Sequence, residues 1–235
     1  MKKHLCLLSL IGAILFFACT PNTVCDCPKT SVTEQTKAQT AQGCTAEALG
    51  TDLGKPVVAE GQEIVLRPAS KVRDVSLMES LWNRKSSREV LADPIKEQDL
   101  SDLLWASYGI NRVDEKKLTA PSSRNRQSVS VYAAFEKGIY KYESASHRLV
   151  LIQSGDLRPN KSAPVELIFS SNAEDPQTQG IDTGVAAENV YLFCASAGLG
   201  TVLRMMREDS TELRQALKLK DEEKLVFNLA IGYLK

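Results

Sequence analysis

The sequence predicts a single α+β domain, because helical and strand-like patterns occur in separate stretches of the chain. Helical periodicity covers roughly residues 76–109, short β-rich runs fill residues 129–171, and signals for both return after residue 182. Such grouping favours a mostly antiparallel sheet flanked by helices over a regularly alternating parallel fold. The chain of 235 residues is long enough to bury one sizeable core.

Residues 1–18 have the pattern of a secretory signal. A basic start precedes an uncharged apolar run that is shorter than the ~20 residues a membrane-spanning helix needs. The ending LFFAC resembles a bacterial lipobox, which predicts diacylation of Cys19 as the first mature residue. Phe16 and Phe17 depart from the usual lipobox residues, so ordinary secretion with nearby cleavage is the alternative. Thr20 is not the aspartate that retains some lipoproteins at the inner membrane, which favours the outer membrane of a bacterial cell envelope.

Residues 19–56 predict a tether rather than a folded segment. Its first part, residues 20–45, contains seven threonines, three glutamines and no aromatic residue, too little apolar surface for a core. In an oxidising envelope, Cys44 can pair with either Cys25 or Cys27. A three-cysteine metal site is the weaker alternative, because the spacing matches no common zinc pattern.

Two helices are expected to open the folded domain, residues 57–235, after a short strand in EIVLRP. Ser76 is suited to cap the first helix, whose inward-facing side chains we expect to be Leu77, Leu81 and Trp82. The second helix lies in SDLLWASYGI and ends at Gly109. Its apolar face is formed by Leu100, Leu103, Leu104 and Tyr108.

Four strands and a long helix are expected to follow. VSVYAAF, GIYKYE and RLVLIQ predict a meander, and APVELIFSS predicts a central strand. Asp182 is suited to cap a helix of small residues that runs to Ala197 before Gly198 or Gly200, with Cys194 as a buried free thiol. A strand in TVLRM, a helix over Ser210–Leu217 and a strand in KLVFNLAIGYL complete the domain.

Composition excludes several classes of function. The 29 basic and 29 acidic side chains balance, whereas a nucleic-acid-binding protein needs a strongly basic face. His147 is the only histidine after the signal, which argues against a serine–histidine hydrolase and a histidine-rich metal centre. We expect His147 to lie in a turn or at the surface.

The stretch WNRKSSREV gathers three cations around two serines at the end of the first helix. Arg84, Lys85 and Arg88 repel one another unless solvent or an anion screens them. One interpretation is a solvated, charged helix end. The other is a phosphate site, because guanidinium groups and hydroxyls donate hydrogen bonds in the geometry that a phosphate accepts.

Four segments resemble the nitroreductase family of FMN-dependent oxidoreductases, in the family's order and spacing. RKSSRE is similar to an R-x-S-x-R signature after the first helix, and TAPSSRNRQ to a Pro-Ser-Ser loop with Asn-x-Gln. AGLGTVLRM follows a small-residue helix, and NLAIGYLK is similar to the final strand. GIYKYESASHRLVLI also resembles a branch with peptide-azoline oxidases and envelope relatives. The resemblance implies a nitroreductase-like fold, homodimeric, with a central mostly antiparallel β-sheet flanked by helices.

The resemblance also implies FMN as the cofactor, bound across the dimer interface. The basic cluster would bind the phosphate, the Pro-Ser-Ser loop would come from the other subunit, and a backbone amide after the second glycine would face flavin N5. The residues that match these family positions are Arg84, Lys85, Ser86, Arg88, Pro121, Ser122, Ser123, Asn125, Leu203, Arg204, Met205 and Met206. Many relatives add a basic tail residue, for which Lys235 is the candidate here. The dimer interface is expected along the helix from Asp182 and around Leu103.

The function that the resemblance implies is hydride transfer through flavin N5. NAD(P)H or another electron donor would reduce the flavin, and a nitroaromatic, quinone or enone would oxidise it. Met205 and Met206 replace smaller family residues, and we expect their bulk to border the substrate space and to disfavour NAD(P)H. One alternative is an azoline-oxidase-like dehydrogenase, for which Lys141 and Tyr142 are the candidate pair. The other alternative is a non-catalytic envelope lipoprotein.

Overall fold

The computed structural model describes residues 53–206 and 210–235. The predicted signal, the lipidation site at Cys19 and the tether cysteines Cys25, Cys27 and Cys44 lie outside this part of the chain. None of the helices in the described ranges is long and apolar enough to cross a membrane.

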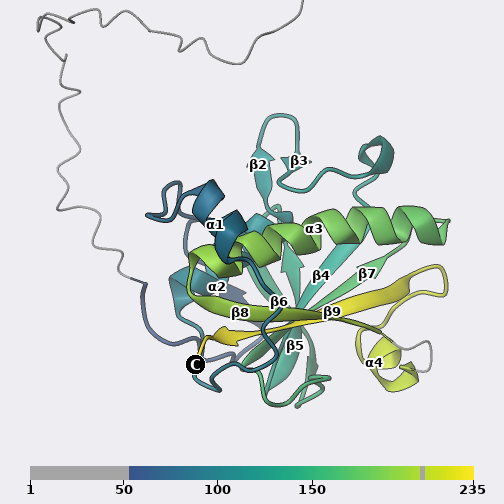
Figure 1. Cartoon of the computed structure of the whole chain (residues 1–235). Helices are drawn as coiled ribbons and strands as arrows, with labels where there is room; N and C mark the ends of the chain where they lie inside the picture. The colour runs from purple at the N-terminus through teal and green to yellow at the C-terminus, as the bar shows by residue number, and fades with distance from the viewer. Residues whose placement is uncertain (1–52, 207–209) are drawn as a thin grey trace, which may run out of the picture. The chain divides into compact units, whose positions relative to one another are not determined.

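A seven-stranded sheet forms the centre of the described domain (Figure 1), with the strand order β1-β6-β5-β4-β7-β9-β8 and antiparallel pairing throughout. The predicted meander and central strand are therefore confirmed. The strands are β1 Glu63–Val65, β4 Val129–Phe135, β5 Gly138–Glu143, β6 Arg148–Ser154, β7 Val165–Ser171, β8 Leu199–Met205 and β9 Lys224–Tyr233.

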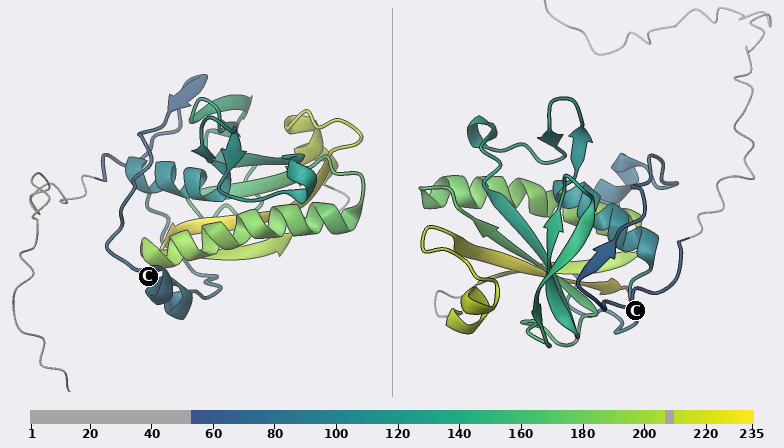
Figure 2. Two further views of the ribbon diagram at one scale, coloured as in Figure 1. Left: turned by 90° about the horizontal axis from the view of Figure 1, so that it is seen from above. Right: turned by 180° about the vertical axis from the view of Figure 1, so that it is seen from behind.

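Helices cover both faces of this sheet. α2 (Glu97–Tyr108) and α3 (Pro176–Ser196) bury apolar side chains against one face, where Leu100, Leu103 and Leu104 are fully enclosed. α4 (Thr211–Ala216) packs against the other face. Figures 1 and 2 show α3 and α4 on opposite sides of β9. This layered α+β arrangement follows from strands that are apolar on both faces.

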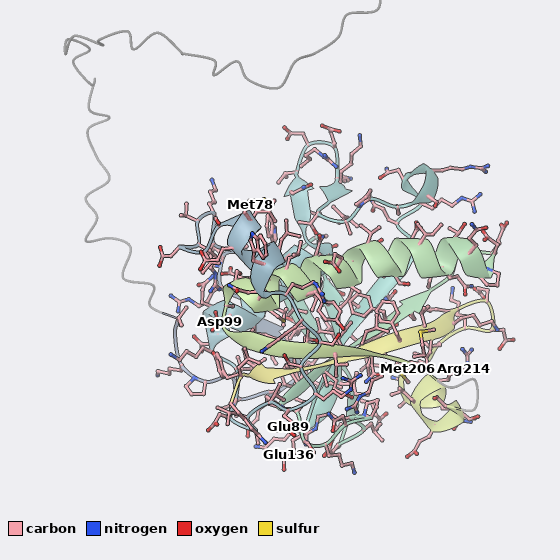
Figure 3. The ribbon with its side chains drawn as sticks, in the orientation of Figure 1. Met78, Glu89, Asp99, Glu136, Met206 and Arg214 are labelled. Carbon is pink, nitrogen blue, oxygen red and sulfur yellow. The ribbon has the colours of Figure 1, made fainter. Side chains whose placement is uncertain are left out.

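The first helix, α1 (Leu77–Asn83), differs from the prediction in its orientation. Ser76 caps it as expected, because its side chain accepts a hydrogen bond from the Glu79 amide over 3.1 Å. The buried residue of the helix is Ser80, however, while Leu77, Leu81 and Trp82 are exposed. The expectation that these three face inward is therefore wrong. The neighbouring Met78, which Figure 3 labels on α1, is exposed as well.

The N-cap of α3 lies seven residues before the predicted cap, Asp182. Asp175 accepts a hydrogen bond from the Thr178 amide over 2.9 Å, and Pro176 occupies the first turn, where its missing N–H is no loss. Asp182 therefore lies inside the helix and is almost fully buried. Its carboxylate has a different role, which is described with the candidate site.

A small hairpin and a 3₁₀ turn occupy the stretch between α2 and β4, where no regular element was expected. The hairpin pairs β2 (Ile110–Arg112) with β3 (Lys117–Leu118), and the turn η2 covers Ser123–Asn125. Both elements are short and polar, so they lack the periodicity that identifies longer elements.

A buried charged network fixes the end of β9 to α2. Arg73 donates to Asp99 and Asp102, at 2.9 and 2.6 Å, and Tyr233 donates to Asp99 over 2.7 Å. Burial alone would lower the pKa of Arg73, but its hydrogen bonds to the two carboxylates raise it above the ordinary value. Burial also raises the pKa of Tyr233 to about 12, so its hydroxyl remains a donor. The network thereby holds the C-terminal strand β9 beside the chain segment that carries Arg84, Lys85 and Arg88.

Candidate active site

The basic segment, residues 84–88, follows the end of α1 and lies beside β8. Among the described residues, no carboxylate lies within salt-bridge distance of Arg84, Lys85 or Arg88. The nearby Glu89 instead lies 3.6 Å from the Lys235 ammonium. Three cations without an acidic partner leave their hydrogen-bond donors available to an anion.

Two glycines allow the basic segment to approach β8 closely. The Ser87 amide donates to the Thr201 carbonyl over 2.8 Å, and the Leu91 amide donates to the Tyr233 carbonyl over 2.8 Å. A methyl group at Gly200 would lie 3.0 Å from the Ser87 side chain and 2.9 Å from Val90. Gly200 of AGLG and Gly232 of IGY, which pair across β8 and β9, therefore leave the space that the segment occupies.

Tyr191 of α3 joins the basic segment to β8, a role that the sequence analysis did not identify. Its hydroxyl accepts from the Leu203 amide over 2.8 Å and lies 3.3 Å from the Ser86 hydroxyl. The Arg84 guanidinium lies 5.6 Å from the centre of its ring. The only sequence signal was an aromatic residue with a polar tip on a helix of small residues.

A hollow of about 50 Å³ lies between the basic segment and α3. It is lined in part by Ser87, Tyr191 and Thr201, and the Thr201 hydroxyl is the one buried polar side-chain atom without a partner in the described ranges. This volume suffices for an ordered water but not for a flavin.

Strand β8 lies at the edge of the sheet, so one side of its backbone has no neighbouring strand. Tyr191 contacts this side at Leu203, and the strand continues beyond that contact. Leu203 and Met205 form non-hydrogen-bonded pairs with β9, so their amides point away from it, whereas the Met206 amide donates to the Val226 carbonyl over 3.1 Å. Because Tyr191 accepts from Leu203, Met205 carries the next free amide of the edge. Its side chain is 70% exposed.

Side-chain directions along β8 alternate, which separates the four predicted residues into two pairs. Leu203 packs with the core on the α3 side, and Met205 shares that side. Arg204 and Met206 point to the other side, where Met206 packs against the α4 cluster and lies near Arg214 in Figure 3. The two methionine side chains, which were expected to border one substrate space, therefore lie on different sides of β8.

The predicted residues Pro121, Ser122, Ser123 and Asn125 lie in one loop. Both serines of this loop form hydrogen bonds within the chain. Ser123 donates through its amide and its hydroxyl to Asp182, at 2.9 and 3.1 Å, and the Gln127 amide donates to the Ser122 hydroxyl over 2.9 Å. Pro121 and Asn125 are exposed, and Asn125 adopts a left-handed φ of 55°. The side chains of Arg124, Asn125 and Arg126 are exposed and make no hydrogen bond among the described residues, so they remain available to a ligand.

The loop and the basic segment lie at opposite ends of α3 (Figure 1). Asp182 contacts the loop and Tyr191 contacts the basic segment. These two positions of the helix are nine residues apart, which corresponds to about 13 Å along its axis. One chain therefore does not bring the two predicted halves of the cofactor site together.

The remaining predicted residues lie apart from this arrangement. Lys235 is exposed and interacts with Glu89, next to the basic segment. Lys141 and Tyr142 are neighbours on β5 and point to opposite faces: the Lys141 ammonium lies 5.8 Å from the Tyr132 ring centre, and the Tyr142 hydroxyl lies 2.8 Å from His147. They do not form a pair.

His147 lies in the β5–β6 turn, as expected, but is half-buried and hydrogen-bonded. Its Nδ1 lies 2.8 Å from the Tyr142 hydroxyl, and its Nε2 lies 2.8 Å from Ser101 and 3.0 Å from the Arg67 carbonyl. A carbonyl only accepts, so Nε2 carries the hydrogen and cannot act as a base toward Ser101. Burial lowers the pKa of His147, although the Arg67 carbonyl opposes this shift. The cluster is structural.

Comparison with known proteins gives a consistent set of similarities. The family model described as the nitroreductase family matches residues 81–233, a range that contains the basic segment, the loop and β8. A crystal structure of a candidate nitroreductase from Ralstonia eutropha JMP134 has a TM-score of 0.70 and 33% identity, over 77% of this chain and 94% of that one.

Two further relatives are more distant. A candidate nitroreductase of Methanocaldococcus jannaschii is 29% identical over 177 residues, which is 64% of this chain and 88% of that protein. A candidate nitroreductase structure from Anabaena variabilis shares the fold, with a TM-score of 0.57 and 16% identity, over 68% of this chain and 38% of that one.

Proposed function

The chain belongs to the nitroreductase family and is therefore an oxidoreductase, and we propose that it uses FMN bound between two copies of itself. The observation that carries this proposal is the basic segment, whose three cations have no carboxylate partner among the described residues. The phosphate of FMN has a charge of about −2, and guanidinium groups bind such a dianion with charge-assisted hydrogen bonds.

In this proposal, the basic segment and the edge of β8 contact different parts of FMN. Arg84 and Arg88 would bind the phosphate, with Lys85 and Ser86 as further donors. The free edge of β8 would present the Met205 amide to the flavin ring, where a main-chain donor stabilises negative charge. FMN supplies hydride transfer when it is bound, and the protein supplies position and electrostatics.

We propose that a second copy of the chain takes part, because the two predicted halves of the site are separated along α3. The loop of residues 121–127 lies at the far end of α3, so we propose that a partner's loop completes the site. α1 supports this arrangement, since Leu77, Met78, Leu81 and Trp82 form an exposed apolar face on it. Leu103 cannot belong to such an interface, because the chain's own core encloses it. Of α3, only the half-exposed side is accessible to such an interface.

We propose flat, apolar acceptors as substrates, such as quinones and nitroaromatics. The exposed Met205 side chain lies on the same side of β8 as Tyr191 and gives that surface an adaptable apolar character. NAD(P)H remains the expected donor of the family, and a quinol is the alternative outside the inner membrane. Lys141 and Tyr142 point to opposite faces of β5, which disfavours an oxidase of the azoline type. The cations of the basic segment have no carboxylate partner among the described residues, which disfavours a non-catalytic role.

We also propose that the enzyme is anchored in the cell envelope through a lipid on Cys19. The support is the signal-like start and the LFFAC ending. Replacement of Cys19 by serine should release the protein from the membrane fraction and remove the acyl mass from its N-terminus. A wild-type protein that is soluble and lacks the acyl mass would reject the anchor without affecting the flavin proposal.

The test of the main proposal is direct. The purified protein should be yellow, should release FMN on denaturation, and should sediment as a dimer with one flavin per chain. A colourless protein that does not bind added FMN would reject FMN as the cofactor. A flavin-loaded monomer would reject the shared site.

A further inference from the structure

We propose that Tyr191 is a positioning residue that makes Ser86 a hydrogen-bond donor to the flavin phosphate. This inference rests on the proposed function, since it names the anion that Ser86 addresses. Tyr191 would thereby help the protein to distinguish FMN from riboflavin, which lacks the phosphate.

The direction of the hydrogen bonds follows from the chemistry of the three groups. The Leu203 amide can only donate, so the Tyr191 oxygen accepts over 2.8 Å. The phenol's own hydrogen then needs an acceptor, and among the described residues the Ser86 hydroxyl, at 3.3 Å, is the side-chain group within hydrogen-bonding distance of it. Either hydroxyl can donate at this distance; we assign Ser86 as the acceptor, which leaves the Ser86 hydrogen for an external acceptor.

Charge and exposure indicate what this acceptor is. Ser86 is exposed and lies between Arg84 and Arg88, which have no carboxylate partner in the described part of the chain. An anion held by these cations lies within reach of the Ser86 hydroxyl. A chain of hydrogen bonds that runs in one direction, from the Leu203 amide through Tyr191 to Ser86, polarises each donor toward the anion.

Tyr191 also constrains one of the cations. Its ring lies 5.6 Å from the Arg84 guanidinium carbon, within the range of a cation–π contact. Replacement of Tyr191 by phenylalanine retains this ring and removes only the hydroxyl. The substitution therefore separates the hydrogen-bond chain from the stacking of Arg84.

A purely structural role for Tyr191 is less well supported. The basic segment is attached to the sheet without it, through the Ser87 amide on Thr201 and the Leu91 amide on Tyr233, both at 2.8 Å. The space left at Gly200 fixes the same segment sterically. We therefore expect the phenylalanine variant to fold and to hold residues 84–88 in place.

The experiment measures the affinity of the apoprotein for FMN and for riboflavin by flavin fluorescence. Ser86→Ala should weaken FMN binding about tenfold, the size of one charge-assisted hydrogen bond, and should leave riboflavin binding unchanged. Tyr191→Phe keeps the donor but frees its orientation, so it should produce a selective loss of FMN affinity no larger than that, and the double variant should be no weaker than Ser86→Ala alone, because both changes break one chain. Tyr132→Phe, on the other face of the sheet, is the matched control.

The outcomes separate this inference from the proposal on which it rests. Equal losses for FMN and riboflavin, or additive losses in the double variant, would overturn the hydrogen-bond chain while leaving FMN as the cofactor. A wild-type protein that binds neither flavin would overturn both. A selective, non-additive loss of FMN affinity in folded variants is the result that supports it.

Discussion

The basic segment and the loop of residues 121–127 are both rich in hydrogen-bonding side chains, yet the chain satisfies only the serines of the loop and leaves the cations of both regions without a carboxylate partner among the described residues. The loop's serines bond to Asp182 and to the loop's own backbone. The cations of the basic segment have no carboxylate partner among the described residues. The difference indicates that the loop is shaped in advance by its own chain, whereas the basic segment is completed by a ligand.

The first prediction removes the unsatisfied charges. Arg84→Ala with Arg88→Ala should weaken FMN binding by at least about 100-fold, because each charged hydrogen bond to a phosphate contributes about 1.5–3 kcal/mol. The protein should still fold, since both side chains are accessible to solvent. Lys71→Ala with Lys161→Ala makes the same charge change at two exposed positions outside both regions and is the control. An unchanged FMN dissociation constant in the first variant would reject the phosphate site.

The second prediction asks whether the two regions meet only across a dimer. Trp82 is 85% exposed on α1, and a central aromatic residue of an interface typically contributes about 2 kcal/mol or more. Trp82→Ala should therefore raise the dimer dissociation constant about 30-fold and lower FMN occupancy with it. Val113→Ala, another exposed apolar side chain, should change neither. Sedimentation at several protein concentrations measures both, and an unaffected dimer would show that α1 lies outside the interface.

The third prediction loosens the satisfied region. Asp182 accepts hydrogen bonds from the Ser123 amide and from the Ser123 and Ser128 hydroxyls. An amide at this buried position leaves at least one donor unpaired, so Asp182→Asn should cost about 1–3 kcal/mol. The control is Asp175→Asn, because asparagine is an equally good helix cap. If both variants melt at the same temperature, Asp182 does not hold the loop.

Much of the fold could be predicted because its signals are local. The strands from residue 129 to 171 have β-rich composition and short turns, and Ser76 precedes its helix as a cap should. The start of α3 was also readable from Asp175 and Pro176, an N-cap followed by a proline suited to the first turn, but Gly180 and Gly184 obscured the helical pattern.

The rest depends on tertiary contacts that no local pattern specifies. Periodicity shows that α1 has an apolar face, but it does not say whether that face meets the chain's own core or a second chain. Tyr191 gains its role only because α3 brings it beside β8 and the basic segment. The family motifs identified the basic segment and the loop, whereas their separation along α3 required the structure.

The smallest expected effect concerns Met205 and Met206, which alternation along β8 assigns to different environments. Met206 packs against the α4 cluster, so Met206→Ala should lower the melting temperature, as the loss of apolar contacts does, and should leave flavin reduction unchanged. Met205 is exposed beside the free strand edge, so Met205→Ala should leave stability unchanged and speed reduction by NAD(P)H a few-fold, because a bulky group borders the proposed ring site. Stopped-flow bleaching of the flavin measures the rate in both variants. Faster reduction in the Met206 variant, with none in the Met205 variant, would mean that the flavin lies on the α4 side of the strand, away from Tyr191.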